Sequence, residues 1–106
     1  MSLAGEMRHR LLIEEPIETP DSEGGMSRSF APLTMIWAKI DPLRGRGDVE
    51  FDALQARITH RVTIRSGVDL SLRHRLSEGG RYFIIHAFRA SADDRLIEID
   101  AEERID

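Results

Sequence analysis

The segment of residues 58–65 limits the possible folds of this chain more than any other part of the sequence. Its letters, ITHRVTIR, alternate mostly apolar residues with polar ones. Successive side chains of a β-strand point to opposite faces, so this pattern predicts a strand with one apolar and one polar face. Such a strand has to bury its apolar face against other strands, which makes a β-rich domain the starting expectation.

Four further segments favour strands, namely residues 8–15, 26–41, 81–90 and 95–103, and the last two should form a hairpin. Pro32 interrupts the second segment, which predicts an edge or a bulge there. Later in that segment Ile36, Ala38 and Ile40 share one face, and Trp37 lies on the other.

Proline and glycine divide these segments. Residues 16–25 contain two of each and predict a loop of about ten residues. Residues 68–78 give no firm assignment. In residues 48–57 the apolar positions have helical spacing behind Asp48, which predicts a short helix; a loop that becomes ordered only in an assembly is the alternative.

Together these expectations describe one domain over residues 1–106, with a flexible arm at residues 1–7. The fold class is mainly β, a small antiparallel β-barrel or sandwich with one short helix or long loop inserted between strands. Residues 1–10 lack the apolar stretch of a secretion signal, and no apolar run reaches the roughly 20 residues of a membrane helix. We therefore expect the protein to be cytoplasmic when it is made.

The charges of the chain argue against binding to duplex DNA by charge alone. Fifteen basic residues against nineteen acidic ones give a net charge of −4. Lys39 is the only lysine, and arginine forms fixed, forked hydrogen bonds with carboxylates, so the composition suits salt bridges between subunits. A codon bias toward arginine explains the same composition equally well. A nucleic-acid-binding surface would place aromatic residues among the arginine clusters. Here the aromatic residues fall mostly at expected core positions.

No pattern of catalytic or metal-binding residues stands out in the sequence. Cysteine is absent, and the four histidines have no spacing typical of a metal site. The Gly24-Gly25 and Gly79-Gly80 pairs lack the setting of a phosphate-binding loop and are better explained as turns. We expect a protein that is not an enzyme and that uses no cofactor or metal.

The order of the motifs is more specific than any one of them. They are MRHR (residues 7–10), TPD (19–21), RSF (28–30), IWAKIDPLRGR (36–46), THRVTIR (59–65) and GGRYFII (79–85). This succession resembles the phage head–tail joining family, also called head–tail adaptor or head-closure proteins, over about residues 5 to 103.

The resemblance implies a structural neck protein of a tailed phage or a phage-like gene-transfer particle. Such a protein forms a homo-oligomeric ring of six or twelve copies below the portal or adaptor protein. The ring closes the head channel around packaged DNA and offers a platform to a tail terminator or other tail protein. The finished protein would then reside in the neck of the particle.

Two sets of residues follow from that implied role. By its place in the chain, the loop facing the channel would include Arg44, Gly45, Arg46, Asp48, Glu50 and Asp52. A closed ring needs two different side faces that meet head to tail, and candidate interface residues are Arg61, Arg65, Arg73 and Arg75. The charged residues of the loop facing the channel could equally be ordinary solvated charges. The alternative functions are a tail-terminator or tail-tube ring protein and a small nucleic-acid-binding β-barrel.

Overall fold

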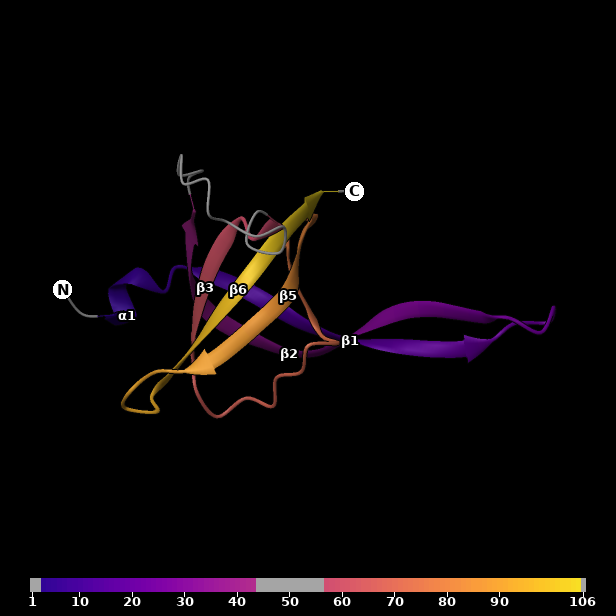
Figure 1. Ribbon diagram of the computed structural model, residues 1–106, viewed down its shortest axis with the longest axis horizontal. Coiled ribbons are helices and arrows are strands. Elements are labelled where there is room, and N and C mark those ends of the chain that lie inside the picture. The colour runs from indigo at the N-terminus through magenta and orange to yellow at the C-terminus, as the bar shows by residue number, and fades with distance from the viewer. Residues whose placement is uncertain (1–2, 44–56, 106) are drawn as a thin grey trace.

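The computed structural model describes residues 3–43 and 57–105, which form a closed antiparallel β-barrel (Figure 1). The short helix α1 (Leu3–Glu6) precedes the strands. The strands are β1 (His9–Pro20), β2 (Met26–Pro42), β3 (His60–Arg65), β4 (Arg75–Glu78), β5 (Arg81–Ala90) and β6 (Leu96–Ile105). Their order around the barrel is β1-β2-β3-β6-β5-β4, and β4 pairs with β1 to close it. The mainly-β prediction is confirmed, and the architecture is the barrel.

The apolar face expected for residues 58–65 lies inside this barrel. Val62 and Ile64 are fully buried, while Arg65 at the end of β3 is exposed. All six strands contribute to the core, and Phe83 on β5 is its largest side chain. Full burial of an apolar side chain of this kind contributes about 1.5–3 kcal/mol. The buried members are Leu11, Ile13, Ala38, Val62, Ile64, Leu76, Phe83, Ile85, Ile99 and Ala101.

The prediction of a ten-residue loop at residues 16–25 is wrong. β1 and β2 stay paired as far as Pro20 and Met26, and only residues 21–25 make the turn. In Figure 1 this hairpin projects well beyond the barrel. Beyond the barrel each strand has one free edge, and a proline whose missing N–H would face that edge breaks no ladder hydrogen bond. Pro16 and Pro20 therefore fit into a strand that we had expected to end before them.

The bulge expected at Pro32 is confirmed. The β1–β2 register shifts between Ile13, which lies opposite Thr34, and Glu14, which lies opposite Pro32. Leu33 is thus the extra residue on β2. A bulge increases the local twist of a strand pair, and this one sits where the hairpin leaves the barrel.

Three further segments, at the chain start and in its middle, complete the comparison with the sequence predictions. Met7 was expected to belong to an arm with little to pack, but it is buried against the barrel, directly after α1. β4 lies within residues 68–78, which had no firm assignment from the sequence pattern. The helix expected at residues 48–57 lies almost wholly outside the described residues. Among the described residues, no helix is long and apolar enough to cross a membrane.

Candidate interaction surfaces

The tip of the β1–β2 hairpin is held by one side chain. Oδ1 of Asp21 accepts hydrogen bonds from the backbone N–H groups of Glu23 (2.9 Å) and Gly25 (2.8 Å). Gly24 has a φ of 84°, a conformation that strongly favours glycine. Across the hairpin, Arg28 donates to Glu18 at 2.9 Å, and this hydrogen bond and the charge of Arg28 lower the pKa of Glu18.

Residues 17–29, which we call the arm, touch water on both faces. Every residue of the arm is exposed, including Ile17 (42%) and Met26 (60%). One arginine against three carboxylates (Glu18, Asp21 and Glu23) gives the arm a charge of 1 − 3 = −2. A two-stranded ribbon is marginally stable alone, because neither of its faces is packed. The arm is therefore a surface suited to contact with another molecule.

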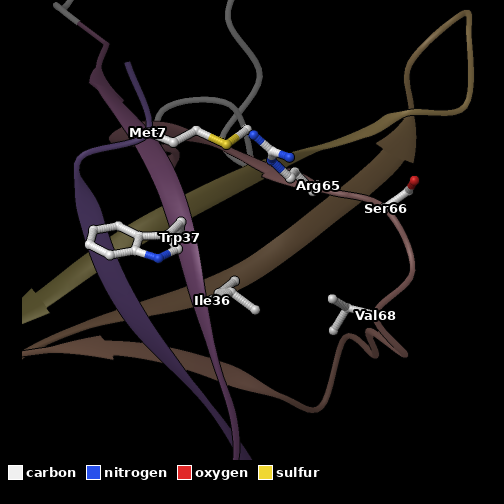
Figure 2. A pocket seen from close by; sticks show the side chains of 6 residues that line it. All are labelled: Met7, Ile36, Trp37, Arg65, Ser66 and Val68. Carbon is white, nitrogen blue, oxygen red and sulfur yellow. The ribbon is translucent and has the colours of Figure 1, made fainter. Parts of the chain in front are cut away.

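A second surface is an apolar pocket beside the start of β1 (Figure 2). It has a volume of about 500 Å³ and is lined by Met7, Ile36, Trp37, Arg65, Ser66 and Val68. Trp37 lies on the outer face of β2, opposite Ile36, Ala38 and Ile40 as the alternation indicated, but it is 52% exposed and is not one of the core aromatics that we expected from the sequence. The guanidinium carbon of Arg10 lies 5.1 Å from the centre of the indole ring. We call this site the Trp37 pocket.

A third surface is the groove between the base of the arm and β4–β5. There the guanidinium of Arg75 lies between two aromatic rings, 3.9 Å from the centre of Phe30 and 4.1 Å from that of Tyr82. Its Nε donates to Glu14 at 2.6 Å. Cation–π stacking and a charged hydrogen bond together fix this arginine. The contact joins four strands, β1, β2, β4 and β5, and stiffens the root of the arm.

On the outer face of β3, β6 and β5, Asp100 is shared by two arginines. Its carboxylate lies 3.3 Å from Arg61 and 3.1 Å from Arg89. Burial alone would raise the pKa of Asp100, but the hydrogen bonds and charges of Arg89 and Arg61 outweigh it and lower the pKa. The same pairing raises the pKa of Arg89.

Each of the four histidines lies within hydrogen-bond distance of another group of the chain. His9 lies 2.7 Å from Glu78 and His86 lies 2.8 Å from Glu102. Nδ1 of His60 lies 2.8 Å from the Thr59 hydroxyl, and Nδ1 of His74 accepts from a backbone N–H. Within residues 3–43 and 57–105, no three potential ligands among His, Asp and Glu gather in a way that could hold a metal ion.

The candidate interface arginines divide into two groups. Arg61, Arg73 and Arg75 each pair with a carboxylate of their own chain, namely Asp100, Glu18 and Glu14. Arg65 lines the Trp37 pocket and has no carboxylate partner among the described residues. Their role between subunits stays a prediction. The candidate channel loop at residues 44–52 lies outside the described residues.

Sequence reasoning missed both the arm and the Trp37 pocket as sites. The only sequence signal for the arm was the match between two β-prone stretches on either side of residues 21–25. The pocket joins residues from the chain start, β2 and the segment after β3, so no local pattern could reveal it.

Comparison with known proteins agrees with this architecture. The chain is similar to a Shigella flexneri 2a protein with a solution structure, at 25% identity and a TM-score of 0.74, covering 93% of this chain and 94% of that one. It also resembles a chain in the virion of a native gene transfer agent particle at 19% identity and a TM-score of 0.63, covering 93% and 96%. A search of curated proteins gave no significant match. The family model for the phage head completion protein matches residues 3–104. The chain therefore belongs to the phage head completion protein family, in agreement with its resemblance to head–tail joining proteins.

Proposed function

We propose that this protein is a non-enzymatic neck component that forms a ring under the portal or adaptor protein, closes the channel of the filled head and receives the tail. The observation that carries the proposal is the family match over nearly the whole described chain. Virion location and contact with other phage structural proteins follow from membership of that family.

The geometry supports a role in assembly. The barrel is small and closed, so its free surfaces are side-chain faces and the edges of the arm. Most of its arginines are held in fixed positions by carboxylates or aromatic rings, as at Arg75 and Arg89. Pre-ordered side chains lose less entropy when a partner binds, and this favours a repeated, regular contact.

The test is co-sedimentation of the purified protein with DNA-filled, tail-less particles. We expect binding at a fixed, saturable ratio that reports the number of copies, together with slower leakage of DNA. No binding by folded protein would contradict the neck role and favour a position on the tail. Tight binding to free DNA that weakens steeply with salt would instead favour the nucleic-acid-binding barrel.

A deletion separates joining from closure. The acidic residues Asp48, Glu50 and Asp52 belong to the segment that the family resemblance assigns to the channel. Deleting residues 48–52 should leave particle binding intact and restore DNA leakage. Leakage as low as with the wild-type protein would show that closure does not depend on these residues.

A further inference from the structure

The arm and the Trp37 pocket are complementary surfaces of the same chain. The arm has exposed apolar side chains, Ile17 and Met26, and a net charge of −2 from residues 17–29. The pocket is mainly apolar, with Arg65 in its lining and Arg10 stacked on Trp37. The arm is acidic and the pocket is basic, and both have exposed apolar side chains.

The arginines near the pocket differ from the others on the barrel. In the described part of the chain, eight arginines lie within ion-pair distance of a carboxylate. Arg10 and Arg65 have no such partner there. Two positive charges beside an apolar pocket suit a partner that is both apolar and acidic, because an ion pair at a partly dry site is stronger than one in water.

The two surfaces cannot meet within one chain. Figure 1 shows the hairpin projecting at one end of the long axis, with α1 at the opposite end, and Met7 of the pocket directly follows α1. The molecule extends 53 Å along that axis. A donor surface and an acceptor surface on different sides of one chain produce a head-to-tail contact, which closes into a ring when the rotation between copies allows it.

We infer that the arm of one subunit docks into the Trp37 pocket of the next copy of this chain. Met26, near the tip of the arm, supplies the apolar contact; Ile17 pairs with Ser29 and therefore lies on the opposite face of the ribbon. Asp21 and Glu23 face Arg10 and Arg65, because the third arm carboxylate, Glu18, is already paired with arginines of its own chain. This inference rests on the proposed ring and names its subunit contact. The arm then adds a contact outside the barrel without any change to the barrel itself.

Engineered cysteines test the contact directly, because the natural chain contains none. Ser27→Cys places a thiol on the arm, and Ser66→Cys places one in the pocket lining. Oxidation of the double variant should give a ladder of linked chains, and a mixture of the two single variants should give mixed dimers. The control pairs Ser27→Cys with Arg104→Cys. Leu96, at the start of β6, pairs with Arg65 of the pocket. Arg104 lies near the other end of β6, roughly 27 Å from Leu96 along the strand.

The oxidation is run on free protein and on protein bound to DNA-filled particles. Cross-linking of positions 27 and 66 well above the control, in either setting, is the expected result. If the protein binds particles but these positions never cross-link above the control, the inference fails while the neck role stands. If the wild-type protein does not bind particles, the proposed function fails, and cross-linking in solution still decides the contact.

A mixing experiment tests the head-to-tail geometry. One variant has residues 18–28 replaced by Asn-Gly, and it keeps its pocket. The other is Trp37→Glu, which changes an exposed side chain of the pocket and keeps the arm. Neither variant should assemble alone, and their mixture should stop at a one-to-one dimer. Rings formed by the arm-shortened variant alone would overturn the inference and assign the arm to another particle protein.

Discussion

Among single residues, Asp100 lies at the centre of an ion-pair cluster on the outer face of the barrel. Its side chain is only 16% exposed and is shared by Arg61 and Arg89. We expect Asp100→Asn to lower the free energy of unfolding by about 1–2 kcal/mol, since both arginines are partly solvated and lose only part of their stabilisation. Urea denaturation measures the loss.

Glu98→Gln is the matched control for that change. Glu98 lies 3.5 Å from Arg89 and is more exposed than Asp100. Its replacement should cost less than about 0.5 kcal/mol. Equal losses for the two variants would show that shared pairing and burial give Asp100 no special role.

Phe83 and Trp37 make a second contrast between residues. Phe83 is fully buried, and Phe83→Ala should cost roughly 3–5 kcal/mol because it leaves a cavity in the core. Trp37→Ala removes a half-exposed ring and should cost no more than about 1 kcal/mol in the isolated subunit. Chemical denaturation of both variants checks the order, and a larger loss for Trp37→Ala would contradict the exposed position of the indole.

His60 makes stability depend on pH. Burial lowers the pKa of His60 below its ordinary 6.5; Glu103 raises it and Arg81 lowers it, both by smaller amounts. The unfolded chain therefore takes up a proton first as the pH falls. The His60 contribution to stability is complete above pH 6.5 and is lost as the pH falls through the lowered pKa.

Unfolding experiments between about pH 7 and about pH 5 measure this effect. His60→Gln should lose less stability over that range than the wild-type protein does. His74→Gln is the control on a histidine outside the barrel strands. An unchanged pH profile in His60→Gln would contradict the assignment.

At the scale of the element, the arm should be dispensable for the fold. Residues 17–29 are exposed and contribute nothing to the described core. Replacing residues 18–28 by Asn-Gly, a pair that favours a tight hairpin turn, should change the barrel's free energy of unfolding by less than about 1 kcal/mol. Denaturant melts and circular dichroism provide the test, and an unfolded product would show that the arm stabilises the barrel.

The strands that could be predicted best are those in which apolar and polar residues alternate within one short segment. β3 and β5 were predicted almost to the residue because one face of each is buried and the turns beside them contain glycine or serine. The outer part of β1 was missed, because prolines usually end a strand and only the pairing of two free-edged strands accommodates them. Residues 26–41, which cover almost all of β2, were expected as a strand. β4 is four residues long, too short for a period to show.

The surfaces could be predicted only in part. Sequence reasoning selected arginine as the residue of interest and Arg65 as an interface candidate, and Arg65 does line the Trp37 pocket. It could not separate Arg65 from Arg61 and Arg75, because their carboxylate partners Asp100 and Glu14 are distant in the sequence. Those pairings exist only once the barrel closes.

At the scale of the whole molecule, a small barrel acquires a long reach from one hairpin. The arm extends the molecule to 53 Å, against 35 and 25 Å along the other axes. In a ring of such subunits, each arm would overlap the next barrel and couple neighbours through a contact that the barrel faces do not provide. Loss of the arm should therefore weaken the ring more than it weakens the subunit.

Electron microscopy of DNA-filled, tail-less particles tests the neck position that we propose for this chain. Particles incubated with the wild-type protein should gain a ring of density at the single portal vertex. Density elsewhere on the particle, or no added density from folded protein, would contradict the neck position.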